Sequence, residues 1–204
     1  CVSAIMAGLF ESDSYMIRQK VLKLLGEEFH IYSDNSMQNL IGYSKQKALK
    51  LKEDIRVYSD EQKTVELLRI KQSGILDFKG NFEIIDGPSG QAIASIKRKA
   101  LMSIGKDSYK VIDTAGREVG EIAEDSLGLG LVRRFIPFAT FVFPQKFTMT
   151  IGGASGKILY SQTVNPVVHK LMVSGVSGSG IDPRIAAAGA ILLIAIEGKQ
   201  SQAG

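Results

Sequence analysis

Two groups of basic residues are spaced for binding anions. Each group closes a short apolar segment with the pattern Lys-x-Lys-Ala-Leu, at 45–49 and again at 97–101. Ammonium and guanidinium groups bind phosphate oxygens, and each contributes about 1 kcal/mol near an anionic membrane surface. If both segments present these side chains on one rim, they form a site for anionic phospholipid headgroups. The alternative is a solvated strand face, on which lysines discourage edge-to-edge aggregation. The residues predicted to bind are Lys45, Lys47, Lys97, Arg98 and Lys99.

A second candidate surface is the segment 127–143, which is apolar apart from Arg133, Arg134 and Thr140. One interpretation is an amphipathic segment that touches a membrane or a protein partner. The other, which we favour, is a helix over 125–135 followed by a strand, both packed on the rest of the fold. The aromatic side chains of this segment that are predicted to contact a partner or a membrane are Phe135, Phe138 and Phe141.

The sequence lacks the residue patterns of common catalytic and metal sites. His30 and His169 are the only histidines, and neither has a cysteine or carboxylate at metal-ligand spacing. No nucleophile elbow or cysteine–histidine pair is present. The glycine-rich stretch 174–180 lacks the Gly-Lys-Ser/Thr of a phosphate-binding loop, so we interpret it as a flexible lead-in to a helix. We therefore expect no enzyme activity, no metal and no cofactor.

Composition places the 204-residue chain among globular domains, and its net charge indicates which partners it prefers. Hydrophobic residues make up 45% and charged residues 23%, which excludes wholesale disorder. The net charge of +4 gives a mild preference for anionic partners. Nucleic acid is disfavoured among these, because no reading helix, RNA-binding motif or tryptophan is present. With 21 Gly and only 5 Pro, the chain is expected to contain many tight turns and hence β-structure.

The only cysteine is Cys1, so no disulfide can form within the chain, which fits a reducing compartment. The chain begins with Cys and not Met, which predicts a fragment or a processed product; a lipoprotein anchored through Cys1 is the lesser alternative. No apolar run reaches the ~18 residues of a membrane span. The expected location is therefore the cytoplasm, with a peripheral position at the membrane if the basic residues bind lipid.

An internal repeat gives the first indication of the fold. Four segments open with an aromatic, any residue and an aliphatic, then pass through an Asp- or Gly-rich turn into a second short apolar segment. Each is typical of a β-hairpin, because the aromatic and the aliphatic share one face of a strand. With the strands expected between them, the chain contains about a dozen, which favours a barrel or a sandwich. The four repeats begin at Phe29, Phe82, Tyr109 and Phe147.

A helix near the end of the sequence decides between these architectures. Asp182 is placed as its N-cap and Pro183 as its first residue, and twelve apolar residues follow at 185–196. We expect it to end at 197–198. At ~1.5 Å per residue the apolar run is too short for a ~30 Å bilayer core, yet it is apolar on every side and must be surrounded. The sequence therefore predicts a closed antiparallel β-barrel with this helix through its centre.

The chain resembles the LURP-one-related family of the tubby C-terminal-like superfamily, which includes the phospholipid scramblases. The resemblance is carried by residues 15–20 (YMIRQK), the hairpins that end in Lys-x-Lys, residues 119–122 (VGEI) and the apolar helix after Asp182-Pro183-Arg184. It implies a twelve-stranded antiparallel barrel around a central C-terminal helix.

The resemblance covers nearly the whole chain and sets the expected domain boundaries. A single tubby-like barrel domain is expected at 14–198, after an N-terminal extension at 1–13 and before a polar tail at 199–204.

The resemblance is less specific about function than about the fold. Tubby domains bind phosphoinositide headgroups and scramblases act at membranes, but no close counterpart of the tubby lysine–arginine pair or of a scramblase calcium segment is found here. The leading expectation is a non-enzymatic barrel that binds anionic phospholipid or acts at the membrane surface. The alternative is a protein-interaction or structural barrel that associates with itself or another protein through strand edges or the segment 127–143, without a lipid ligand.

Overall fold

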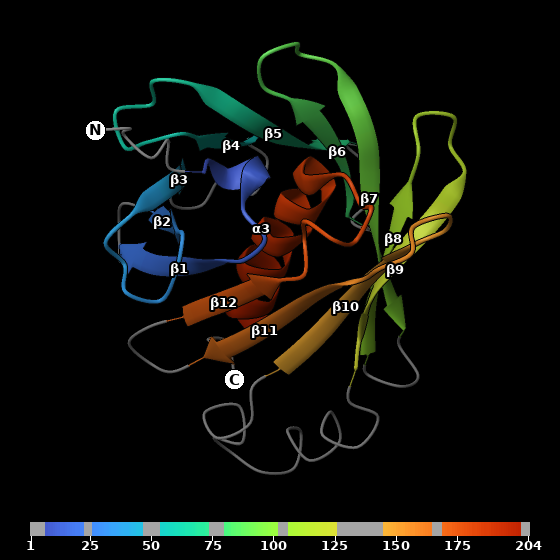
Figure 1. Cartoon of the computed structure of the whole chain (residues 1–204). Coiled ribbons are helices and arrows are strands. Elements are labelled where there is room, and N and C mark those ends of the chain that lie inside the picture. Colours follow the sequence, from blue (N-terminus) through green and yellow to red (C-terminus); the bar gives the residue numbers. More distant parts are fainter. Residues whose placement is uncertain are drawn as a thin grey trace.

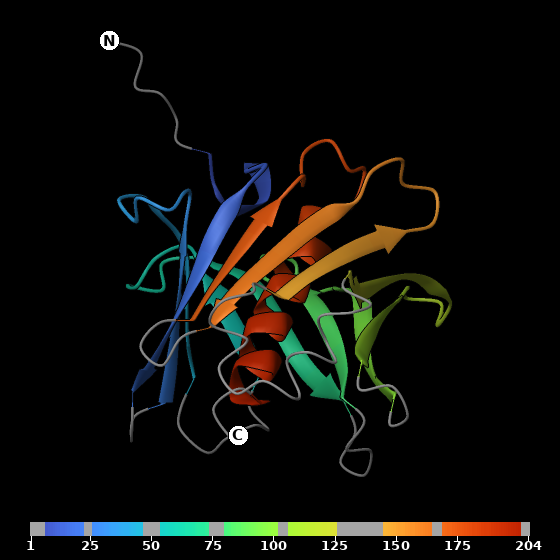
Figure 2. The same cartoon turned by 90° about the horizontal axis from the view of Figure 1, so that it is seen from below.

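The computed structural model describes residues 7–22, 26–46, 54–73, 80–101, 106–125, 145–164 and 169–200. Within them, twelve antiparallel strands form a closed barrel that surrounds one long helix (Figures 1 and 2). The predicted architecture, a barrel with a threaded C-terminal helix, is confirmed.

The strands follow one another around the barrel in chain order, and the first pairs with the last to close it. The connections that follow even-numbered strands lie at the end of the barrel where the helix begins, because antiparallel neighbours alternate in direction. The connections at the other end lie outside the described residues. The strands are β1 (Tyr15–Leu22), β2 (Gly26–Tyr32), β3 (Leu40–Gln46), β4 (Ile55–Tyr58), β5 (Glu66–Ser73), β6 (Asn81–Asp86), β7 (Ala92–Leu101), β8 (Lys106–Ile112), β9 (Glu118–Glu124), β10 (Gln145–Ile151), β11 (Ile158–Val164) and β12 (His169–Ser174).

Alternation along each strand separates an apolar interior from a polar outer surface. In β12, His169, Leu171 and Val173 are buried, whereas Lys170 and Met172 are partly or well exposed. Successive side chains of a strand point to opposite faces, so the buried set lines the barrel and the other set faces outward. All four predicted hairpin segments belong to strands of this kind.

The helix α3 (Pro183–Gln200) occupies the barrel interior, as the sequence predicts. Asp182 caps it, because its Oδ1 accepts the Arg184 N–H at 2.9 Å. The expected end at 197–198 is wrong, since the helix continues to Gln200. A single glycine such as Gly198 costs a helix only about 1 kcal/mol, which does not end it. No helix in the described part of the chain combines the length and hydropathy needed to cross a bilayer.

Small residues let the first half of α3 pass close to the strands. At Gly189 there is no room for a side chain: a Cβ there would lie 2.9 Å from Met149 Cε and 3.0 Å from Ile122 Cδ1. The same Cβ would lie 3.1 Å from the Tyr160 hydroxyl, which donates a hydrogen bond to the Ala186 carbonyl at 3.0 Å. The interior is therefore a close-packed core around the helix.

A short 3-10 helix, η1 (Leu9–Glu11), precedes the first strand and packs against α3. Leu9 is buried in the same core as the helix. Part of the segment expected to be an N-terminal extension thus contributes to the barrel interior.

Candidate anion-binding surfaces

The predicted basic residues lie near the ends of two strands that run in the same direction. Lys45 is close to the end of β3, and Lys97, Arg98 and Lys99 lie in the last half of β7. Both strands end on the same side of the barrel, but β4, β5 and β6 separate them. Lys47 lies outside the described residues, as do Phe135, Phe138 and Phe141 of the predicted contact segment.

The three basic residues of β7 do not share a face. Lys97 and Lys99 are exposed, whereas Arg98 lies between them and is half-buried. Arg98 pairs with Tyr109, which is fully buried in the core, so its side chain starts on the inner face. The described outward-facing residues of the predicted site are Lys45, Lys97 and Lys99, called the rim residues below.

Two of the rim residues are neutralised by neighbouring carboxylates. Lys45 Nζ lies 3.2 Å from Glu28 Oε1, and the Tyr43 hydroxyl donates to the same oxygen at 3.2 Å. Burial raises the pKa of Glu28, but the hydrogen bonds from Lys45 and Tyr43 outweigh it and hold that pKa below its usual value. The Lys45 charge is therefore partly balanced within the chain.

Glutamates pair with two lysines on the outer face of β7, β8 and β9 in the same way. Lys99 Nζ lies 3.8 Å from Glu118 Oε2. Lys110 contacts Glu118 at 3.0 Å and Glu121 at 2.7 Å. The hydrogen bonds that it donates, first to Glu121 and then to Glu118, raise the pKa of Lys110. Glu118 and Glu121 thus offset the charges of Lys99 and Lys110, whereas Lys97, opposite Lys110, forms no ion pair with a described residue.

The structure brings together a different pair of cations, which the sequence patterns do not reveal. Arg18 in β1 lies directly opposite Lys170 in β12, and both side chains are partly exposed on the outer face. Within the part of the chain that the structure describes, neither forms an ion pair. The two residues are 152 positions apart in the sequence, so only the closure of β1 on β12 makes them neighbours.

The inner face of the same strand pair carries a buried polar contact. His169 Nδ1 lies 2.6 Å from Gln19 Oε1. An amide oxygen only accepts, so Nδ1 carries the proton and donates. Burial lowers the pKa of His169 to about 4, which keeps the imidazole neutral. In β11 nearby, Gln162 is buried, and neither of its amide atoms has a partner among the described residues.

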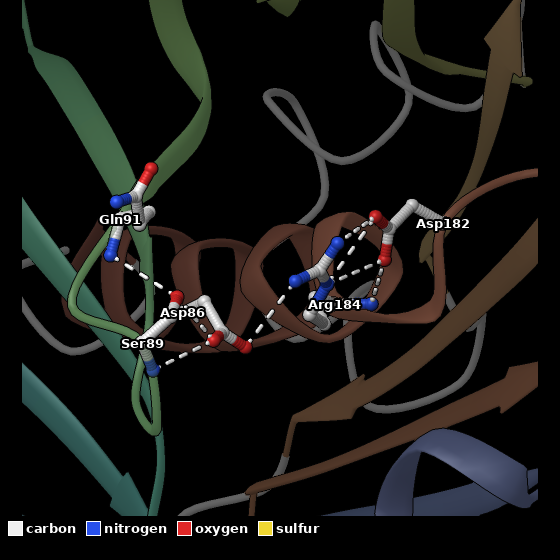
Figure 3. Close-up of polar contacts among 5 residues, drawn as sticks. All are labelled: Asp86, Ser89, Gln91, Asp182 and Arg184. Carbon is white, nitrogen blue, oxygen red and sulfur yellow. Dashed lines mark hydrogen bonds and ion pairs between the residues drawn. The ribbon is translucent and has the colours of Figure 1, made fainter.

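An ionic cluster fastens the helix at the end of the barrel where α3 begins (Figure 3). Arg184 bridges two carboxylates, with Nη2 at 2.7 Å from Asp182 Oδ2 and Nη1 at 3.2 Å from Asp86 Oδ1. Asp86 also accepts the Ser89 hydroxyl at 2.6 Å and the Ser89 N–H at 3.0 Å, which lowers its pKa. Because every charge in it is paired, this cluster is an anchor between α3 and the β6–β7 turn.

A cleft of about 520 Å³ lies at the same end, between η1 and the start of β3. Its lining includes Leu9, Phe10, Leu40 and Leu67, with Glu11 as the one ionisable side chain among its described residues. A single carboxylate beside apolar groups does not form an acid–base pair. Among the residues that the structure describes, no group of three or more His, Cys, Asp or Glu lies close enough to hold a metal ion.

Comparisons with known proteins leave the family open. No protein-family model matches this chain, and no curated protein matches it. Membership of the LURP-one-related family, and of the tubby-like superfamily that contains it, is therefore a proposal that rests on the sequence patterns given above.

Proposed function

We propose that this barrel binds anionic phospholipid headgroups and acts at a membrane surface. The observation that carries the proposal is the pair Arg18 and Lys170, directly opposite each other on adjacent strands and without a carboxylate partner among the described residues. Like charges directly opposite in a sheet are destabilising. An anion that sits between the two side chains removes this repulsion, and a headgroup phosphate has the charge and the acceptor oxygens to do so.

Two further features support a membrane surface as the source of the anion. The chain carries a net charge of +4, and several of its lysines lie on the outer face of the barrel. Each cation near an anionic surface contributes about 1 kcal/mol, so a few acting together give measurable binding that falls as salt screens it. The resemblance to tubby and scramblase domains points to the same ligand class.

Co-sedimentation with lipid vesicles tests the proposal. The chain is mixed with phosphatidylcholine vesicles with and without phosphatidylserine, at low and at physiological salt. We expect binding only to the vesicles that contain phosphatidylserine, strongest at low salt. Absence of binding at both salt concentrations would refute the proposal. A concentration-independent oligomer in light scattering, together with no vesicle binding, would support a self-associating structural barrel instead.

A further inference from the structure

The outer face of β1, β12, β11 and β10 combines positive charge with exposed apolar side chains. Figure 2 shows these four strands side by side on one wall of the barrel. We propose that this wall lies flat against an anionic bilayer, so that the barrel docks by its side. The inference rests on the proposed function and assigns it a surface. The wall, called the seam face below, is defined by Arg18, Lys146, Leu159, Lys170 and Met172.

The members of the seam face occupy neighbouring rows of the sheet. Lys170 lies opposite Arg18 in one row. In the next row, Met172 lies opposite Ser161, and Ser161 lies opposite Lys146. Adjacent strands are about 4.8 Å apart, so the four strands span roughly 15 Å, which is the width of a few lipid headgroups. The positive charges are therefore close enough to act on the same patch of bilayer.

The charge of the seam face suits it to an anionic surface. Arg18, Lys146 and Lys170 form no ion pair with any described residue. Of the carboxylates at its borders, Glu28 contacts Lys45 at 3.2 Å. Asp125 lies beside Lys146 and accepts the neutral Thr148 hydroxyl at 2.6 and 2.7 Å, so it keeps its negative charge. The three cations of the seam face thus outnumber Asp125, and this face keeps a positive potential.

Exposed apolar side chains on the same wall fit an interface with lipid. Leu159 is 44% exposed on β11, and Met172 is 39% exposed on β12, the strand that also carries Lys170. Surfaces that bind at the bilayer interface pair cations with apolar side chains that enter between the headgroups. Such a pairing favours a lipid surface over a purely polar anion such as free phosphate, which gains nothing from Leu159 or Met172.

Matched charge variants test the surface. The seam variant replaces Arg18, Lys146 and Lys170 by Gln, and the rim variant replaces Lys45, Lys97 and Lys99 by Gln. Both lose the same number of positive charges and change no buried side chain. With vesicles that contain phosphatidylserine, we expect the seam variant to bind weaker by roughly tenfold or more and the rim variant by less than about threefold. Thermal unfolding of both variants checks that the barrel is intact.

A fluorescent probe tests the orientation separately. In a Cys1→Ser background, an environment-sensitive dye is attached through Met172→Cys and, as a control, through Lys71→Cys, an exposed position on β5. We expect vesicles to shift the emission to the blue at position 172 only, because that side chain enters the interface. An equal shift at both positions, or a shift only at position 71, would contradict side-on docking.

These outcomes separate the two proposals. If the unaltered chain does not bind anionic vesicles, the proposed function fails. If it binds and the rim variant loses binding while the seam variant keeps it, the lipid function stands and the seam face is the wrong surface.

Discussion

The strand pair β1 and β12 has two faces that treat polar side chains in opposite ways. On the inner face, Gln19 and His169 are buried and joined by a hydrogen bond of 2.6 Å. On the outer face, one residue away along each strand, Arg18 and Lys170 lie opposite each other without a described partner of opposite charge. On the inner face, each side chain of this pair finds its partner in the other, whereas on the outer face water solvates the charged groups.

Substitutions on the two faces should therefore show up in different measurements. A buried polar group without a partner costs about 1–3 kcal/mol of folding free energy. An exposed ion pair contributes about 0–1 kcal/mol, so the charges of the outer face have little influence on stability. Substitutions on the inner face should change the free energy of unfolding, and substitutions on the outer face should change vesicle binding.

The largest effect is expected from a charge inside the barrel. Ala188 in α3 is fully buried, so Ala188→Asp places a carboxylate where no partner or water can solvate it, at a cost of several kcal/mol. We expect the variant to be unfolded by circular dichroism. The control is Thr163→Asp on the exposed face of β11, which should unfold at nearly the temperature of the unaltered chain. A cooperatively folded Ala188→Asp protein would show that α3 is not enclosed.

The second effect is a dependence of stability on pH. The pKa of His169 is about 4 in the folded chain against 6.5 in the unfolded chain. Between these values the unfolded chain takes up a proton that the folded chain rejects, so stability is complete above pH 6.5 and falls as the pH drops toward 4. The total loss is about 3 kcal/mol. Urea unfolding at a series of pH values measures it.

A His169→Gln variant is the control for this pH dependence. It keeps a hydrogen-bonding side chain opposite Gln19 but does not titrate. Its stability should be nearly flat from pH 6.5 to 5, a range in which most carboxylates remain ionised. An equal slope in both proteins would mean that His169 is not the group responsible.

A smaller effect, of opposite sign, is expected in β11. Gln162 is buried without a described partner for either amide atom, so Gln162→Met removes an uncompensated polar group at similar volume. We expect stability to rise by about 1 kcal/mol. The matched change Gln19→Met breaks the bond to His169 and should lower stability by about 1–2 kcal/mol. If both substitutions destabilise the chain, Gln162 has a partner, such as a buried water molecule.

The smallest effect on stability is expected on the outer face. Lys170→Glu turns the like-charged pair with Arg18 into an opposite-charged one, which should raise the free energy of unfolding by about 0.2–1 kcal/mol. The same change should weaken binding to vesicles that contain phosphatidylserine. A variant that is more stable and still binds fully would separate the seam face from the lipid function.

The sequence predicted the architecture because each local signal agreed with the global fold. The hairpin repeats define strands, the Asp182–Pro183 pair starts the helix, and an apolar helix too short for a bilayer must be enclosed. The basic runs at 45–49 and 97–101 were visible because their members are adjacent in the chain. Alternation then divides Arg98 from Lys97 and Lys99, and carboxylates on neighbouring strands balance two of the rim residues.

The seam face could not be predicted in the same way. Arg18, Lys146 and Lys170 belong to three strands that are separated along the sequence, and nothing in their local sequence relates them. Their proximity depends on which strands pair and in which register, and a shift of one residue would move each of them to the inner face. The one signal in the sequence is the alternation of apolar and polar residues in β1, β10 and β12. It marks these three residues as outward-facing but does not show that they are neighbours.

The closure of β1 on β12 also determines when the barrel can fold during synthesis of the chain. Gln19 and His169 are 150 residues apart, and a ribosome adding about 5–20 residues per second needs roughly 8–30 s to make that stretch. Throughout that time β1 has no strand on one edge, and α3, the helix that the barrel encloses, does not yet exist. The barrel is therefore expected to close only after α3 has been synthesised.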